Sequence, residues 1–258
     1  MIKKYITIIL LGALMINVFA TVSYADSTAA SWYVKRSGDK RPELPREHAL
    51  TEKYDAYYID KKLEDKSESK RIYLTFDAGY ENGNVEKILD TLKDKGVPAA
   101  FFVLEHIITK NTDLVLRMTN EGHKVCNHTT NHADLTKLSK EDIIKNLKRL
   151  ESVYKTATGL EMEKYFRFPE GKYSEDALAA VDELGYKTIF WSFGYADWDD
   201  KNQPAAEKSK AKILENTHNG EVILLHPTSS TNAEILPMLI DEWRKMGYSF
   251  GNLDELVR

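Results

Sequence analysis

The sequence predicts an α/β protein, a distorted (β/α) barrel of about seven or eight units with an irregular N-terminal arm. Three observations favour this class. From Arg71 onward, short apolar runs alternate with amphipathic stretches, which is typical of right-handed βαβ units around a parallel sheet. The number of predicted βα units is large enough for the sheet to close, or nearly close, into a barrel. The length of 258 residues provides one large domain with a sizeable core.

Capping and turn residues set the boundaries of the predicted elements. Gly96 ends the first helix, Ser139 begins the longest one with a capping-box-like segment, and Ser174 begins another. The expected strands are 72–76, 99–103, 124–127, 165–168, 188–193 and 222–225, with a short last one near Phe250, and the expected helices are 85–95, 112–120, 139–156, 174–185, 205–218 and 233–246.

Residues 1–25 are typical of a secretory signal peptide. A basic start (1–4) precedes an apolar run (5–22), and Ser23 and Ala25 place small residues where a signal peptidase reads them. An uncleaved membrane anchor is the alternative, but Asn17 interrupts the run and its length is marginal for a membrane span. We therefore expect an extracytoplasmic protein.

Residues 26–70 are expected to form the irregular arm, and residues 71–258 the main domain. The arm has little periodicity, but its aromatic side chains, Trp32 and Tyr58 among them, predict that it packs on the main domain. The net charge of −4 provides no basic face for nucleic acid. The lone Cys126 excludes an internal disulfide and is expected to be buried.

Polar side chains follow the predicted strands at their carboxyl ends, where barrel enzymes place their chemistry. This convergence is the strongest functional signal in the sequence. Taken singly, each residue has an ordinary alternative role. The residues are Asp77, His128, His132, Arg167, Glu170, Asp197 (beside Trp198) and His226. Asp77 could instead be a helix N-cap, Arg167 part of a structural ion pair, Asp197 a turn residue and His226 a core histidine. The spacing of His128 and His132 suits a zinc-type ion but could be incidental.

Together and in this order, these residues resemble the polysaccharide deacetylase family, the NodB-homology or carbohydrate esterase 4 group. The matching segments are 75–79, at four of five positions, then 128–132, 167–169, 197–198 and 224–226. The resemblance covers about residues 71–256 and implies a NodB-type barrel. Residues 80–83, residues 191–192 and arm segments around Trp32, Lys35–Arg36 and 52–56 are similar to the PdaA-type branch of delta-lactam-biosynthetic de-N-acetylases.

The family resemblance implies hydrolysis of an N-acetyl group on an amino sugar. It assigns Asp77 as general base, Arg167 as its partner, and His226 as general acid held by Asp197. His128 and His132 would bind a divalent ion. Leu224 and Trp198 would enclose the acetyl methyl, Tyr195, Trp198 and Tyr80 would stack on sugar rings, and the backbone near Glu170 would help to hold the oxyanion.

Three positions depart from the family pattern. Ala78 stands where the family has the aspartate that supplies a third metal ligand. Either Asp77 or water takes the place of this ligand, or the ion is weakly held or even dispensable. Glu170 and Gly194 also replace family residues, the latter the first aspartate of the fourth motif, with effects that the sequence does not define.

The branch resemblance implies a specific substrate. We expect an exported, monomeric hydrolase that deacetylates N-acetylmuramic acid in stem-peptide-free peptidoglycan, a step toward muramic delta-lactam in spore cortex. Peptidoglycan strands are the expected partner, and the membrane is contacted only through an uncleaved signal segment. Two alternatives remain: a deacetylase for N-acetylglucosamine of peptidoglycan or chitin, and a non-catalytic glycan-binding module.

Overall fold

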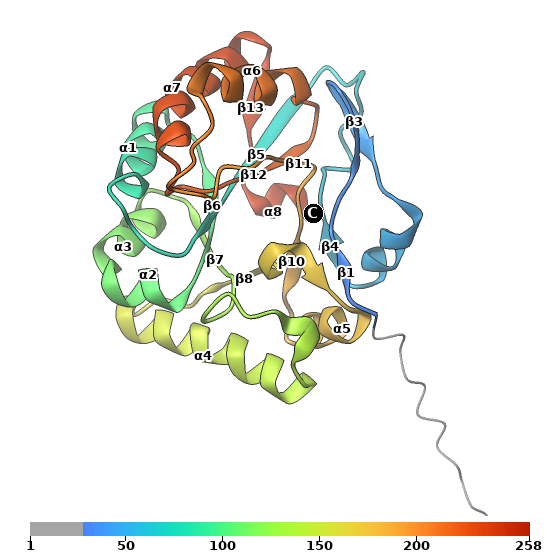
Figure 1. The fold of residues 1–258 in the computed structure, drawn as a ribbon, viewed down its shortest axis with the longest axis vertical. Coiled ribbons are helices and arrows are strands. Elements are labelled where there is room, and N and C mark those ends of the chain that lie inside the picture. The colour runs from blue at the N-terminus through green and yellow to red at the C-terminus, as the bar shows by residue number, and fades with distance from the viewer. Residues whose placement is uncertain (1–27) are drawn as a thin grey trace, which may run out of the picture.

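The computed structural model describes residues 28–258, so the predicted signal peptide lies outside the described residues. The chain folds into a curled parallel sheet surrounded by helices (Figure 1). The strand order is β11-β12-β5-β6-β7-β8-β10-β4, and β13 pairs beside β5. The predicted α/β class and its barrel-like curl are confirmed.

The elements alternate along the chain as the sequence predicted. The strands of the curled sheet are β4 (Ala56–Tyr57), β5 (Lys70–Ala78), β6 (Ala99–Val103), β7 (Lys124–Asn127), β8 (Glu163–Phe166), β10 (Lys187–Ile189), β11 (Phe193–Gly194), β12 (Glu221–Leu225) and β13 (Tyr248–Phe250). The α-helices are α1 (Val85–Lys95), α2 (Glu105–Lys110), α3 (Thr112–Asn120), α4 (Lys140–Thr158), α5 (Glu175–Glu183), α6 (Ala206–Asn216), α7 (Ser230–Lys245) and α8 (Leu253–Leu256).

Local capping explains the boundaries that the sequence predicted well. Helix α1 ends at Gly96, whose φ of 60° is left-handed and suits glycine. Ser139 begins α4 by accepting a hydrogen bond from the backbone N–H of Asp142, and Ser174 begins α5 in the same way from Ala177. Strands β6 and β7 and helix α3 have the predicted bounds.

One predicted strand, 188–193, is divided in the structure. Residues up to Ile189 pair with β8 and β4, and the chain then crosses to β12. The N–H of Phe190 still donates to the Tyr57 carbonyl, whereas that of Ser192 donates to the Val222 carbonyl. The apolar run continues through this change of partner, so the sequence pattern could not reveal it.

The N-terminal arm is more regular than expected, because one of its segments completes the sheet. Strand β4 pairs in parallel with β10, and an antiparallel bridge joins Ile59 to Glu221 at the start of β12. The arm also contains β1 (Ala30–Ser31), β2 (Lys35–Ser37), β3 (Lys40–Glu43) and the 3₁₀ helix η1 (Arg46–Lys53). The arm therefore contacts both β10 and β12, near the two ends of the curled sheet.

Aromatic packing fixes the arm on the main domain, as predicted. The Trp32 ring stacks on Phe190 with centroids 4.1 Å apart, and its Nε1–H donates to the Trp191 carbonyl at 2.9 Å. Trp32 is 6% exposed. The β1 backbone pairs with β9 (Lys172–Tyr173), which follows β8.

Apolar side chains fill the interior of the curl below the functional end. Tyr73, Phe102, Cys126 and Val222 form this inner cluster together with residues of α8. Figure 1 shows α8 within the ring of strands. Cys126 is fully buried, as expected. Among residues 28–258, no helix is both long and apolar enough to span a membrane.

Candidate active site

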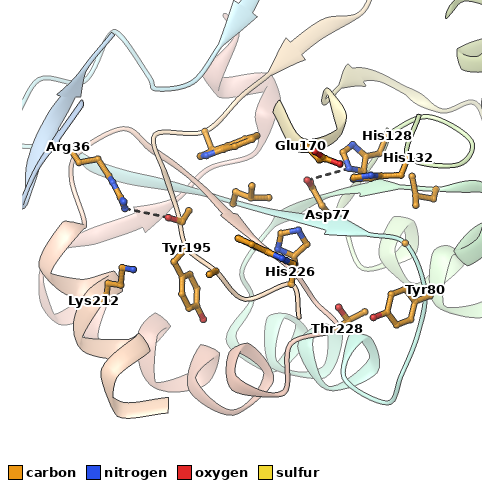
Figure 2. Close-up of a pocket in the computed structure, with 17 residues that line it drawn as sticks. Arg36, Asp77, Tyr80, His128, His132, Glu170, Tyr195, Lys212, His226 and Thr228 are labelled. Atoms are coloured by element: carbon orange, nitrogen blue, oxygen red, sulfur yellow. Dashed lines mark hydrogen bonds and ion pairs between the residues drawn. The ribbon is translucent and has the colours of Figure 1, made fainter. Parts of the chain in front are cut away.

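A pocket of about 860 Å³ opens at the carboxyl ends of the sheet strands (Figure 2). Arg167 and Asp197 are buried immediately behind its wall, where they bind two of the lining residues. The structure thus brings together every site residue that the sequence predicted. The predicted residues that line the pocket are Asp77, Tyr80, His128, His132, Glu170, Tyr195, Trp198, Leu224 and His226.

Asp77 and Arg167 form the first polar pair of the site. Asp77 lies near the end of β5, and Arg167 directly follows β8. The fully buried guanidinium donates to Asp77 Oδ1 at 2.9 Å, to Thr75 Oγ1 at 2.8 Å and to the Ile189 carbonyl at 2.9 Å. With its donors engaged on several sides, the guanidinium holds the carboxylate in one orientation.

The surroundings of Asp77 favour its ionised form. Burial alone would raise the pKa of this carboxyl group, but the facing His128 and Arg167 side chains outweigh burial, and the pKa is lowered. The side chain remains 11% exposed toward the pocket. An oriented carboxylate in this state can accept a proton.

His128 turns an unpartnered nitrogen toward Asp77. Its Nδ1–H donates to the Arg167 carbonyl at 2.9 Å, which assigns the lone pair to Nε2. This Nε2 is buried without a hydrogen-bond partner and lies 3.4 Å from Asp77 Oδ2. Burial lowers the pKa of His128 to about 4, so the ring is neutral at physiological pH.

His132 lies beside His128 because the connecting loop adopts unusual backbone angles. Thr129 and His132 have φ values of 71° and 58°, both left-handed. The Asn127 side-chain oxygen accepts the N–H of Thr129 and secures the loop at 3.0 Å. The two imidazole centroids are 5.0 Å apart, with the rings edge to face.

The two histidines fit a divalent ion as a pair. A buried, neutral and unpartnered imidazole nitrogen is a metal-ligand donor, and His132 lies next to it. Ala78 is fully buried and supplies no donor atom. Among residues 28–258, no three His, Cys, Asp or Glu side chains are placed to hold an ion together.

His226 and Asp197 form the second polar pair. Asp197 accepts from His226 Nδ1 at 2.7 Å and from the His226 backbone N–H at 2.8 Å. Asn232 Nδ2 donates to the same carboxylate at 2.6 Å. Burial alone would lower the pKa of His226, but the hydrogen bond and charge of Asp197 raise it overall. Because Asp197 binds Nδ1 of the His226 ring, the other ring nitrogen, Nε2, is not bound by Asp197.

The remaining predicted residues provide the pocket surface. Trp198 is 62% exposed, and its ring lies edge-on to His226 with centroids 6.2 Å apart. Leu224, on β12, forms apolar wall beside it. Tyr80 and Tyr195 also line the pocket, but their hydroxyl groups bind Asp200 and Asn232, respectively.

Glu170 occupies a strained turn at the edge of the pocket. Its φ of 54° is left-handed, and its carboxylate pairs with Lys172 Nζ at 2.6 Å. The neighbouring Gly171 has a φ of 65°, and a Cβ there would lie 2.8 Å from the Trp191 ring. The turn is thus fixed by glycine at one position and by tight packing around it.

Sequence reasoning missed two cations on the pocket wall. Arg36 comes from the arm strand β2, and Lys212 comes from helix α6. Trp191, Leu104 and Thr228 also line the pocket. Only the similarity of Lys35–Arg36 to one branch of the family could have drawn attention to Arg36, because its position depends on how the arm packs.

A curled parallel α/β sheet whose rim presents a carboxylate–guanidinium pair and a carboxylate–imidazole pair is suited to acid–base hydrolysis. The family description "Polysaccharide deacetylase" matches residues 64–189. The chain belongs to the polysaccharide deacetylase family and is a deacetylase hydrolase.

Similarity to individual relatives extends over most of the chain. Peptidoglycan-N-acetylmuramic acid deacetylase PdaA of Bacillus subtilis is 39% identical over 230 residues, which cover 88% of this chain and 85% of the relative. The PdaA structure, described as a family 4 carbohydrate esterase, superposes with a TM-score of 0.83 at 36% identity, covering 89% and 97% of the two chains. A family 4 carbohydrate esterase from Bacillus anthracis gives a TM-score of 0.73 at 37% identity, covering 90% and 98%.

Proposed function

We propose that the protein is an exported hydrolase that removes the N-acetyl group from N-acetylmuramic acid in stem-peptide-free peptidoglycan. In spore cortex this reaction precedes closure of muramic delta-lactam. One observation carries the hydrolytic part of the proposal: Asp77 and His226 line one pocket, and the pKa is lowered for Asp77 and raised for His226. The similarity to PdaA over 88% of the chain supports the substrate.

In amide hydrolysis, the Asp77–Arg167 pair provides the general base and the Asp197–His226 pair provides the general acid. Asp77 takes a proton from water as the water oxygen attacks the acetyl carbonyl, and Arg167 keeps the carboxylate ionised and oriented. His226 then gives a proton to the sugar nitrogen as the C–N bond breaks, which releases acetate and an amine. Asp197 holds the imidazole at Nδ1, so that Nε2 is the atom that delivers the proton.

The pocket wall supplies the binding contacts in this proposal. Leu224 and Trp198 enclose the acetyl methyl group. Trp198, Tyr195 and Tyr80 contact the sugar rings, and the backbone N–H of Glu170 helps to stabilise the negative oxygen of the intermediate. His128 and His132 would hold a divalent ion, loosely because Ala78 adds no carboxylate. When bound, the ion would polarise the carbonyl and the attacking water.

Residues 1–25 would direct export, residues 26–70 would form the arm, and residues 71–258 would form a deacetylase domain that acts as a monomer on the outer side of the membrane. The support is the basic, then apolar start of the sequence and the packing of Trp32 on Phe190.

Two other functions make different predictions. A deacetylase for N-acetylglucosamine would use the same acid–base set on a different sugar. A glycan-binding module would need none of that set, yet Asp77, Arg167, Asp197 and His226 are all present and paired. The second alternative is therefore disfavoured by the buried polar pairs, which are costly to maintain without a use.

Acetate release from two purified glycans tests the proposal. Peptidoglycan strands are prepared with and without stem peptides, and each is incubated with the wild type and with Asp77→Asn. We expect release from muramic residues of the peptide-free glycan by the wild type alone. Release from N-acetylglucosamine residues instead would establish the first alternative. Binding of the glycan without any release, by both proteins, would establish the second.

A further inference from the structure

Two cations lie on the pocket wall away from Asp77 and His128. Figure 2 shows Arg36 and Lys212 on the opposite side of the pocket from the catalytic carboxylate. They come from segments far apart in the sequence, the arm strand β2 and helix α6. Both residues are exposed, so a soluble ligand can reach them.

The fold positions the Arg36 side chain without neutralising it. Its Nη1 donates to the Gly194 carbonyl at 3.4 Å, and its guanidinium lies 5.1 Å from the centroid of the buried Phe193 ring. Neither contact supplies a negative charge. The planar guanidinium keeps further N–H donors available in a geometry that matches a carboxylate.

Neither cation has a carboxylate partner in residues 28–258. The carboxylates that line the pocket are engaged elsewhere, Asp77 by Arg167 and Glu170 by Lys172. Glu221 on β12 is fully buried with both oxygens unpartnered. Burial raises its pKa well above the usual value despite the opposing charge of Arg36, so its neutral form is favoured.

Position 194 adds no side-chain charge to this side of the pocket. Gly194 has no side chain, and its carbonyl accepts a hydrogen bond from Arg36. A Cβ at this position would meet the Trp191 ring at 3.4 Å and Leu224 at 3.5 Å, both of them pocket residues. An aspartate at position 194 would therefore bring a negative charge to this side of the pocket.

We propose that Arg36 and Lys212 form a carboxylate-binding subsite that recognises the lactyl group of muramic acid and makes the enzyme selective for this sugar. The inference rests on the proposed function and adds the residues that choose the substrate. A muramic residue without a stem peptide carries a lactyl group with a free carboxylate. This group is attached to the ring carbon adjacent to the one that bears the acetamide, where N-acetylglucosamine has a neutral hydroxyl group. The carboxylate is either that of the reacting sugar or that of the next muramic residue along the strand.

The test compares glycan with free lactyl carboxylates against the same glycan after conversion of those groups to methylamides. The double variant R36Q/K212Q should lower the preference for free carboxylate, expressed as the ratio of kcat/KM values, by about tenfold. Gly194→Asp should lower the same ratio. The matched controls are Lys35→Gln, next to Arg36, and Lys210→Gln on α6, whose side chain pairs with Glu207 at 3.0 Å. These controls should leave the ratio unchanged.

A substrate with a single muramic residue identifies the source of the carboxylate. If the double variant loses preference on that substrate, the reacting sugar supplies the group. If the loss needs two muramic residues, the neighbour supplies it. An unchanged ratio on both substrates overturns the subsite while leaving the deacetylase proposal intact.

Equilibrium binding separates failure of the subsite from failure of the proposed function. The wild type should bind the carboxylate glycan more tightly than the methylamide glycan, and this difference should shrink in R36Q/K212Q and at high salt. A binding difference without acetate release would refute the proposed reaction but retain the subsite. Equal binding of the two glycans by the wild type would overturn the subsite whatever the enzyme releases.

Discussion

The guanidinium of Arg167 holds the carboxylate of Asp77 at 2.9 Å, across 90 residues of sequence, with the arginine fully buried. Burial of such a pair is costly unless its hydrogen bonds are complete. Thr75 and the Ile189 carbonyl accept other donors of the same guanidinium. The pair therefore fixes the position of the Asp77 carboxylate and favours its ionised form.

Replacement of Arg167 should move the acid side of the pH–rate profile. Arg167→Gln removes a charge and a hydrogen bond that lower the pKa of Asp77, so that only His128 and His226 oppose the raising effect of burial. Because Asp77 must be ionised to act as the base in the proposed reaction, the acid limb of the kcat/KM profile should shift to higher pH. Near neutral pH, kcat/KM should fall by about 10- to 100-fold. Arg167→Lys keeps the charge and should shift the limb less.

Equal acid limbs in Arg167→Gln and the wild type would argue against Asp77 as the base. Thermal unfolding of both variants, measured alongside, separates this outcome from a loss of folded protein. The buried site makes some destabilisation certain, since Asp77 is left without its partner.

Asp197 should control the alkaline side of the same profile. In the proposed reaction His226 must be protonated to act as the acid, and Asp197 raises its pKa against the opposing effect of burial. Activity is therefore retained as pH rises until the raised pKa is passed. Asp197→Asn should lower that pKa and move the alkaline limb to lower pH, with kcat reduced by about 10²- to 10⁴-fold.

Asn232 offers the matched control for this experiment. It donates to Asp197 Oδ2 at 2.6 Å but carries no charge. Asn232→Ala removes this hydrogen bond, together with those to the His226 carbonyl and the Tyr195 hydroxyl group, and leaves the negative charge beside His226. Its alkaline limb should therefore stay closer to that of the wild type. A shift as large as that of Asp197→Asn would assign the effect to lost packing.

The two histidines should account for any dependence on a divalent ion. Chelation should lower kcat, and added divalent ion should restore it, because His128 and His132 offer a weak two-imidazole site. The double variant H128Q/H132Q should bind less metal by calorimetry and no longer respond to it. His106→Gln, exposed on α2, serves as the control. Full turnover after complete chelation would remove the ion from the mechanism.

The sequence predicted elements whose boundaries are set locally. Gly96 ends α1 and Ser139 begins α4 through contacts within a few residues, so both could be read directly. Strand β4 has two residues and is defined by its pairing with β10, so no local pattern marks it. Helix α2 was missed because its six residues are too few to show a helical period.

The same distinction applies to the site. Asp77 and His226 stand at the ends of apolar strands, where topology alone brings them to one rim. Arg36 reaches the pocket only because the arm packs across the sheet, and Lys212 only through the placement of α6. Contacts that depend on the packing of irregular segments have no signature in residue spacing.

Trp32 should couple the stability of the arm to that of the sheet. Its ring stacks on Phe190, and its backbone N–H donates to the Gly171 carbonyl at 2.9 Å. Trp32→Ala should lower the free energy of unfolding by about 3 kcal/mol, whereas Tyr33→Ala, at a position 46% exposed, should change it by less than about 0.5 kcal/mol. Urea unfolding followed by circular dichroism measures both. Because the arm carries β4 into the sheet, a single cooperative transition is expected, and a separate early transition for the arm would show that it folds independently of the domain.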